Sequence, residues 1–183
     1  MVIKMTDRCK EKIASSVRNF RLPRYHEIPS VGLYLEQTTK YIAEYLDQLQ
    51  EGCISSSMIS NYVKKHLISN PVKKQYDREQ IAYLIFIALA KNVLSLDNIA
   101  LFIQLQKQTY TAERAYNYFC DELENMLYFV FELKDVMDNV GMDSTDEKVM
   151  LRNTIIAITQ KVYLNKCFQA MAEEREDTKP EKP

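Results

Sequence analysis

Residues 54–103 read ISSSMISNYVKKHLISNPVKKQYDREQIAYLIFIALAKNVLSLDNIALFI, and this stretch decides the fold. Ser55 is a favourable N-cap, because its side-chain oxygen can accept a hydrogen bond from the first turn of a following helix. The sequence therefore predicts a helix over residues 56–66. Asn70-Pro71 then ends whatever follows that helix, because proline disfavours helix at the residue before it.

Two further helix starts follow a basic connection at residues 72–76, which we expect to form a short extended arm. Asp77 with Gln80 three residues later is a variant of the capping box, and Ser95 is a second N-cap of the Ser55 type. The predicted order is therefore helix, basic loop, helix, helix. A helix presented in this way can lie in a DNA major groove while the loop beside it touches phosphate, so residues 56–66 are a candidate recognition helix.

The residues before this stretch predict two more helices. Residues 7–20 carry apolar side chains at helical spacing, and residues 33–49 repeat that pattern up to Gly52, a plausible C-terminal stop. Between them, Pro23 and Pro29 bracket a segment that we expect to be irregular or extended.

The C-terminal half carries the clearest periodicity. A heptad-like seam with alternating spacings of three and four predicts one helix over residues 111–140. Gly141 ends it, and Ser144 with Glu147 opens a last helix over about 146–172. The seam consists of Tyr116, Phe119, Leu123, Met126, Val130, Leu133, Met137 and Val140.

The seam has two interpretations. It can pack against the last helix of its own chain as an αα-hairpin, or against its copy in a homodimer. The last helix is apolar on more than one face, so we expect more than one neighbour to bury it, and both contacts can coexist. The candidate dimerisation residues are Tyr116, Phe119, Leu123, Met126, Val130, Leu133 and Met137.

Composition favours a mostly helical chain, with 3 glycines and 5 prolines among 183 residues. The formal net charge is −1, but residues 54–80 carry five basic and two acidic side chains, a local +3. Residues 111–183 carry 15 acidic and 9 basic side chains, a local −6. DNA would repel the acidic half, so we expect that half to face away from it.

The sequence gives little support to a zinc protein, an enzyme or a membrane protein. The four cysteines and two histidines are too dispersed for a zinc site, and scattered cysteines favour a reduced, cytoplasmic protein. Cys120 and Cys167 lie among apolar residues of predicted helices, so we expect these two thiols to be buried. The sequence lacks an apolar signal segment, a membrane-spanning run, a glycine-rich phosphate loop and a nucleophile elbow. We therefore expect neither an enzyme nor a membrane protein, and no cofactor.

The same stretch resembles a known family. Ile54-Ser55, Ile59, Tyr62 and Leu67 are similar to the second helix of the MerR-type winged-helix regulators. Lys74-Gln75-Tyr76 stands at the family's Arg-x-Tyr wing ending, and NVLSLDNI, residues 92–99, resembles its Gly-Phe-Ser-Leu-Glu-Glu-Ile step. More closely, LPRYHEIPSVGLYLEQ (22–37) with SSMISNYVKKHLI (56–68) resembles an uncharacterised bacterial domain family with this core, a likeness expected to cover nearly the whole chain.

The resemblance implies a fold and a set of sites. The expected fold is all-α with minimal β structure, a MerR-like winged helix-turn-helix core followed by a long-helix αα-hairpin. The expected divisions are a lead-in (1–32), the core (33–107), a dimerisation or effector region (108–172) and a disordered tail (173–183). The residues implied to face DNA are Ser57, Met58, Ser60, Asn61, Tyr62, Lys64, Lys65, Lys73 and Lys74, and the basic cluster adds Arg78 as a phosphate contact.

Our sequence-based hypothesis is a dimeric transcriptional regulator that binds double-stranded DNA and responds to an unknown small-molecule effector. The alternative is a helical protein–protein interaction or dimerisation module that has lost DNA binding. That alternative is motivated by Ser57 and Ser60, which replace the arginines usual in MerR-type recognition helices, and by a short wing without glycine.

Overall fold

The computed structural model describes residues 5–138, 140 and 145–177. These residues form seven α-helices, two short 3-10 helices and one two-stranded sheet, so the predicted all-α class with minimal β structure is confirmed. In chain order the elements are α1 (Asp7–Ser15), η1 (Tyr25–Glu27), β1 (Leu33–Tyr34), α2 (Leu35–Leu46), η2 (Asp47–Leu49), α3 (Ser56–Lys64), β2 (Gln75–Tyr76), α4 (Arg78–Ala90), α5 (Leu96–Thr109), α6 (Ala112–Val130) and α7 (Asp146–Asp177).

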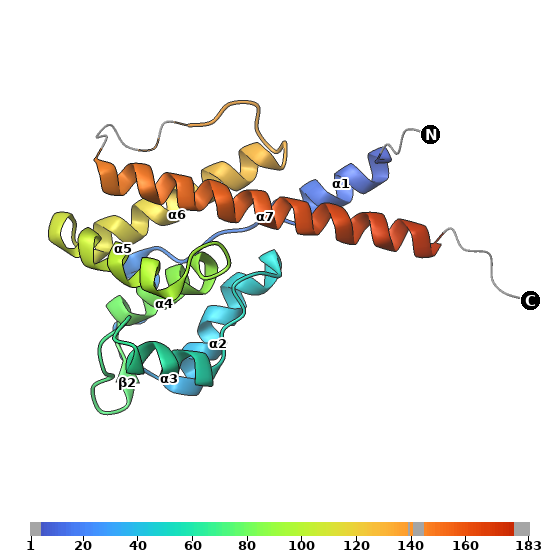
Figure 1. The fold of residues 1–183 in the computed structure, drawn as a ribbon. Helices are drawn as coiled ribbons and strands as arrows, with labels where there is room; N and C mark the ends of the chain where they lie inside the picture. Colours follow the sequence, from blue (N-terminus) through green and yellow to red (C-terminus); the bar gives the residue numbers. More distant parts are fainter. Residues whose placement is uncertain (1–4, 139, 141–144, 178–183) are drawn as a thin grey trace, which may run out of the picture.

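The longest helix, α7, lies across one side of the molecule (Figure 1). Helix α6 packs along the first half of α7, and α1 packs along its second half. Helix α4 contacts α6 and α7 on one side and α2 on the other. Helix α3 and the loop before β2 lie beside each other on the side of the molecule opposite α7 (Figure 1).

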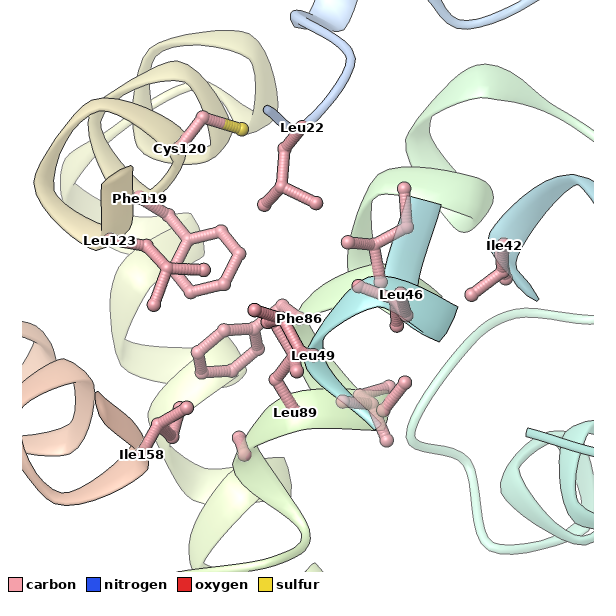
Figure 2. Close-up of a cluster of buried hydrophobic side chains, with 14 of the residues drawn as sticks. Leu22, Ile42, Leu46, Leu49, Phe86, Leu89, Phe119, Cys120, Leu123 and Ile158 are labelled. Atoms are coloured by element: carbon pink, nitrogen blue, oxygen red, sulfur yellow. The ribbon is translucent and has the colours of Figure 1, made fainter. Parts of the chain in front are cut away.

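Helix α4 is the centre of this arrangement. Ten of its thirteen residues are buried, so it has almost no solvent face and needs neighbours on every side. Figure 2 shows Phe86 and Leu89 of α4 among apolar side chains from α2, α6 and α7. The rings of Phe86 and Phe119 meet edge to face, with centroids 5.3 Å apart. One hydrophobic core therefore joins the N-terminal and C-terminal helices.

The helix starts read from the sequence are confirmed. The Ser55 hydroxyl accepts from the amide of Met58, and the Ser95 hydroxyl accepts from the amide of Asn98. At α4 the capping is reciprocal: the Asp77 carboxylate accepts from the Gln80 amide at 2.8 Å, and the Gln80 side chain accepts from the Asp77 amide at 2.9 Å. These starts were predictable because a cap needs only residues three positions apart.

The helix predicted over residues 33–49 begins at Leu35 instead, because Leu33 and Tyr34 form β1 and pair with β2. Two other predicted helices end well before the expected residue. The lead-in helix ends at Ser15, although Val17 and Phe20 beyond it are still buried. Helix α6 ends at Val130 rather than near residue 140, because Glu132 adopts a left-handed conformation, with φ of 57°. The amide of Leu133 then donates to the Tyr128 carbonyl at 2.8 Å, which is the Schellman end of a helix.

The end of the chain also differs from the expected disordered tail. Helix α7 begins as predicted near residue 146 but continues to Asp177, so residues 173–177 are helical rather than part of the tail. The expected stop at Gly141 and cap at Ser144, and residues 178–183, lie outside the described residues.

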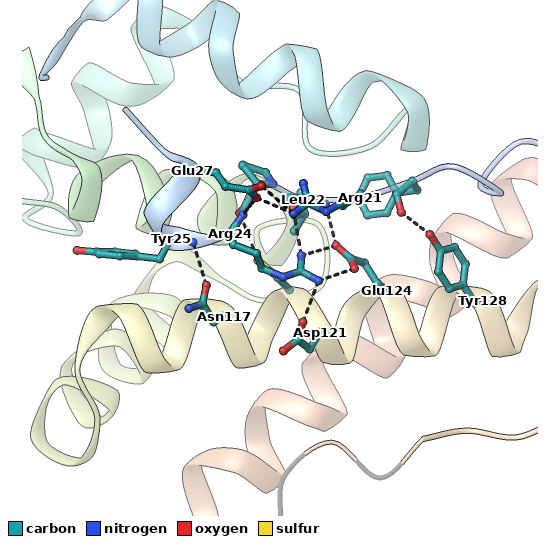
Figure 3. Close-up of polar contacts among 12 residues, drawn as sticks. Arg21, Leu22, Arg24, Tyr25, Glu27, Asn117, Asp121, Glu124 and Tyr128 are labelled. Carbon is teal, nitrogen blue, oxygen red and sulfur yellow. Dashed lines mark hydrogen bonds and ion pairs between the residues drawn. The ribbon is translucent and has the colours of Figure 1, made fainter. Parts of the chain in front are cut away.

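The proline-bracketed segment is held against α6 by buried side chains and polar contacts. We call residues 20–28 the N-terminal strap. Its Phe20, Leu22 and Ile28 are completely buried. Figure 3 shows the polar contacts between the strap and α6: the Tyr128 hydroxyl donates to the Phe20 carbonyl at 2.7 Å, and the Tyr25 amide donates to Asn117 at 2.9 Å.

Arg24 makes the strongest contacts of the strap. Its guanidinium binds both carboxylate oxygens of Glu124, each at 2.7 Å, and one oxygen of Asp121 at 2.8 Å (Figure 3). The Glu124 carboxylate also accepts from the Leu22 amide at 2.8 Å. The hydrogen bond to Glu124 raises the pKa of Arg24 above its ordinary value. A bidentate pair with side chains only 20% and 13% exposed fixes the strap on α6.

We predict that Arg24→Gln lowers the free energy of unfolding by about 2–4 kcal/mol, because Glu124 then keeps a half-buried charge without its cation. Chemical denaturation measures the loss. The control is Arg21→Gln, which breaks a more exposed pair with Glu27 and should have only a marginal effect. Equal losses in the two variants would contradict the role given to Arg24.

Candidate functional site

Helix α3 presents one polar face to solvent. Ser57, Asn61, Lys64 and Lys65 are exposed along it, at the spacings that place residues on one side of a helix. The opposite face is apolar, and its Ile59 is completely buried. The structure therefore brings four of the residues expected to face DNA onto one exposed strip.

Three other residues expected on that strip face elsewhere. Tyr62 is 2% exposed and belongs to the core, so its assignment as a DNA contact is wrong. Met58 is half-buried, and its sulfur lies 3.7 Å from the Lys91 ammonium. Ser60 is also half-buried, and its hydroxyl donates to the Ser56 carbonyl at 2.9 Å. The helical period explains all three, since these positions lie on or beside the inward face.

The basic loop before β2 is a tight turn. The amide of Val72 donates to the Gln75 carbonyl at 3.1 Å, and the amide of Gln75 donates to the Val72 carbonyl at 2.9 Å. Between them Lys73 and Lys74 have φ values of 51° and 65°. Positive φ at both central residues is the pattern of a type I′ turn, which favours Asn-Gly over lysine. Both lysine side chains are exposed at its tip.

A small sheet of two short strands, β1 and β2, connects this turn to the start of α2. Leu33 pairs with Tyr76 and Tyr34 with Gln75, in antiparallel register. Gly32 permits the close approach, because a Cβ atom at this position would lie 2.8 Å from the Cβ of Gln75. The sequence indicated an extended arm at residues 72–76 but gave no sign of its partner strand.

Arg78 has an internal role. Its Nε donates to the Ile28 carbonyl at 2.8 Å, and its Nη2 donates to the His26 carbonyl at 3.3 Å. The guanidinium also lies 5.7 Å from the centre of the Tyr25 ring, a cation–π contact. Arg78 therefore anchors the strap to α4, and its assignment as a phosphate contact is wrong.

The residues that remain define one surface. The α3–turn surface consists of Ser57, Asn61, Lys64, Lys65, Lys73 and Lys74. Within the described part of the chain, none of its four lysines forms an ion pair. One acidic group lies beside it: the Glu36 carboxylate accepts from the Ser56 hydroxyl at 2.8 Å, at the N-terminal end of α3. The positive charge is therefore concentrated at the C-terminal end of α3 and on the turn.

The seam on α6 is buried inside one chain. Tyr116, Phe119, Leu123 and Met126 belong to the core, and the rest of the predicted dimerisation set, Val130, Leu133 and Met137, packs against it. Helix α7 covers α6, and an ion pair of 2.9 Å joins Arg152 to Glu122. The seam therefore packs within the chain, as the αα-hairpin interpretation had it. Tyr116, Phe119, Leu123 and Met126 are buried there, so their assignment to a dimer contact is wrong.

Helix α7 leaves a different apolar face uncovered. It carries five large apolar side chains that are exposed, among them Phe168 with 67% of its surface accessible. The prediction that more than one neighbour buries this helix is confirmed, since α1, α4, α5 and α6 all contact it, but these five side chains stay exposed. The five are Val149, Met150, Ile156, Leu164 and Phe168, which we call the α7 stripe.

The cysteines are structural or isolated. Cys9, Cys120 and Cys167 are buried, as expected for Cys120 and Cys167, and Cys53 is exposed. Burial raises the pKa of the Cys120 thiol to about 12, which makes it a poor nucleophile or metal ligand. Among the described residues no cluster of His, Cys, Asp and Glu is placed to hold a metal ion, and no helix is long and apolar enough to cross a bilayer.

Comparison with known proteins identifies a family. A family model described as a domain of unknown function, DUF1836, matches residues 23–119. This match covers just over half of the chain, so the chain belongs to that family. The match starts in the strap and ends within α6, rather than covering nearly the whole chain. No curated protein and no solved structure matches, so the comparisons give no link to the MerR-type regulators.

We predict that Gly32→Ala destabilises the protein by about 1–3 kcal/mol, because the added methyl group forces β1 away from β2. Urea denaturation measures the loss, and hydrogen exchange at the Val72 and Gln75 amides should accelerate. Ser30→Ala, at an exposed neighbouring position, is the control. An unchanged midpoint and unchanged exchange would show that the sheet tolerates a Cβ atom here.

Proposed function

We propose that this chain binds double-stranded DNA, with the exposed face of α3 in the major groove and the Lys73-Lys74 turn on the phosphate backbone. The observation that supports the proposal is the α3–turn surface. It places four lysines, which have no carboxylate partner among the described residues, beside an exposed helix face on the side of the molecule opposite α7. The acidic α6 and α7 would then lie away from the DNA, as electrostatic repulsion requires.

The chemistry of this surface predicts weak discrimination between sequences. Asn61 offers a bidentate hydrogen bond to adenine, whereas a serine hydroxyl such as that of Ser57 donates or accepts and so distinguishes bases poorly. The Glu36 carboxylate beside the first turn of α3 disfavours phosphate there. The contacts to DNA would therefore come mainly from Asn61, Lys64 and the turn, and most of the affinity from phosphates.

We predict that the double variant Lys73→Asn/Lys74→Gly folds at least as well as the wild type but binds DNA less tightly. Asn-Gly suits the positive φ values of the turn, so the melting temperature should rise by about 2–4 °C. Two lost phosphate contacts should reduce the slope of log K against log salt concentration by about 2. Fluorescence anisotropy with a labelled pool of random 25-base-pair duplexes, from 25 to 200 mM KCl, measures the slope.

The control removes the same charge from the far side of the molecule. Arg8→Gln/Lys10→Gln alters α1, whose side chains here are exposed, and should leave the slope unchanged. If the wild type does not bind the pool at 25 mM KCl, or if the turn variant and the α1 variant bind equally, the proposal of DNA binding fails.

We further propose that two copies associate through the α7 stripe. Between Val149 and Phe168 this face is about 30 Å long at 1.5 Å per residue. Lys161 lies at its edge, where it forms an ion pair of 3.8 Å with Glu51. A helix face of this length can pack against its own copy in antiparallel orientation, the arrangement that two-fold symmetry allows. A protein with a single short recognition helix gains specificity from a second half-site, so a dimer fits the proposed binding mode.

Leu164→Glu/Phe168→Glu should convert such a dimer into a monomer, because two carboxylates would be buried without partners in the contact. Light scattering on a chromatography peak distinguishes the 21.5 kDa monomer from a particle of twice that mass. Gln104→Glu/Gln108→Glu, which adds the same charge on the exposed side of α5, is the matched control. A wild-type protein that is monomeric at all concentrations overturns the dimer proposal.

The competing function is a helical interaction module that does not bind DNA. The α7 stripe favours it, because an exposed apolar face of this size marks a protein contact in many folds. The anisotropy experiment separates the two functions, since a module of this kind predicts no binding to the duplex pool at any salt concentration.

A further inference from the structure

A polar cavity lies between α1, the segment at the end of η2 and the second half of α7, on the side of the molecule where Figure 1 shows α1 along α7. Its volume is about 160 Å³. One water takes up roughly 30 Å³ and drug-sized sites begin at roughly 300 Å³, so a small ion or a single functional group fits here. The polar residues of the lining are Lys12, Ser16, Gln50, Lys166, Gln169 and Glu173.

Lys166 is the buried cation of this cavity. Only 8% of its surface is exposed. Its ammonium donates to the Gln48 carbonyl at 2.9 Å and forms no ion pair within the described part of the chain. An ammonium has three donors, so two of its N–H groups remain without a protein acceptor there. A buried charge without an opposite charge is costly, and the cavity beside it can hold the missing anion.

The other two charged side chains of the lining neutralise each other. Lys12 of α1 forms an ion pair with Glu173 of α7. The other oxygen of the Glu173 carboxylate accepts from the Gln169 amide at 3.0 Å. This carboxylate is therefore turned to partners of its own and does not compensate Lys166. The lining carries an excess of one positive charge, which favours an anion in the cavity.

The donors around the cavity come from three elements. Lys166 belongs to α7 and Lys12 to α1, while Gln50 follows η2. The exposed side-chain amide of Gln50 makes no hydrogen bond among the described residues, so it can donate to a ligand. A tetrahedral oxyanion offers acceptor oxygens in several directions, whereas a carboxylate offers two in one plane. Donors that approach from three elements therefore suit the tetrahedral anion better.

We propose that this cavity binds a phosphate-sized oxyanion, with one oxygen on the Lys166 ammonium and others on Lys12 and Gln50. The anion supplies the opposite charge that Lys166 lacks and joins α1, η2 and α7, which are far apart in the chain. The proposal goes beyond DNA binding and does not rest on it, since none of these residues belongs to the α3–turn surface.

Thermal unfolding of the full chain without DNA tests the proposal, with inorganic phosphate as the probe. At constant ionic strength, about 10 mM phosphate in place of chloride should raise the melting temperature by about 3 °C, because the anion binds only the folded state. This rise should saturate at millimolar phosphate, whereas the general stabilising effect of phosphate on proteins keeps growing with concentration. No rise, or a rise that does not saturate, overturns the site.

A pair of variants locates the anion. Lys166→Met keeps the length of the aliphatic chain but removes the charge, so the saturating rise should disappear. Lys161→Met is the matched control, because it removes a cation from the same helix that pairs with Glu51 and does not line the cavity. A saturating rise in Lys166→Met equal to that of the wild type overturns the assignment, as does loss of the rise in both variants.

Gln50→Gly tests the site without altering the buried lysine, in case Lys166→Met does not fold. Glycine adopts the φ of 56° at this position freely, so the backbone is retained. Loss of the amide donor should weaken phosphate binding about three- to tenfold, measured from the concentration at which the rise is half complete. An unchanged affinity contradicts the proposed set of donors.

Two further probes define the ligand. Acetate at the same concentration should give a much smaller rise than phosphate, and an equal rise overturns the preference for a tetrahedral anion. Glycerol 3-phosphate distinguishes a free anion from the phosphate group of an ester. A saturating rise with either phosphate compound supports the site, and the larger of the two rises identifies the form that it takes.

Discussion

The complete burial of helix α4 is the constraint on which the rest of the structure depends. An apolar helix without a solvent face folds only when every side of it is covered. Helix α2 covers one side, while α6 and α7 cover another, so the N-terminal and C-terminal halves cannot form separate cores. The buried Gln80 amide extends this dependence outward, because it donates to the Ser69 carbonyl at 2.8 Å and so ties the start of α4 to the segment that follows α3. The packing of α4 in the core therefore determines where the neighbouring α3–turn surface, with its four exposed lysines, lies.

The N-terminal strap explains why the apolar seam of α6 is not available to a second copy. The strap lies on α6 through Arg24 and buried leucine and isoleucine side chains, and α7 covers another face of the same helix. Helix α6 is therefore an internal element, and the exposed apolar stripe lies on α7 instead. The family match begins within the strap, at residue 23, and ends within α6, the helix that the strap contacts.

The features that could be predicted from the sequence are those that depend on hydrogen bonds between residues close together in the chain. Helix starts at Ser55, Asp77 and Ser95 were predictable because each cap involves residues three apart. The end of α6 before Glu132 was not, since the left-handed residue there is not a glycine. The charge pattern of the sequence predicted the basic cluster but not the orientation of the Arg78 side chain. Its hydrogen-bond partners lie 50 and 52 residues away in the chain. The pairing of β2 with β1 likewise depends on a contact between distant segments, which periodicity does not report.

The burial of three cysteines has a practical consequence. All four cysteines lie in the described part of the chain, and Cys53, two residues before the cap of α3, is the exposed one. A thiol-reactive dye should therefore attach at a single native position next to that helix, without any substitution in the chain. The fluorescence of this dye would change when a partner binds at α3 but not when one binds at the far end of α7. The molecule thus carries its own attachment point for a spectroscopic reporter on the surface whose role matters most.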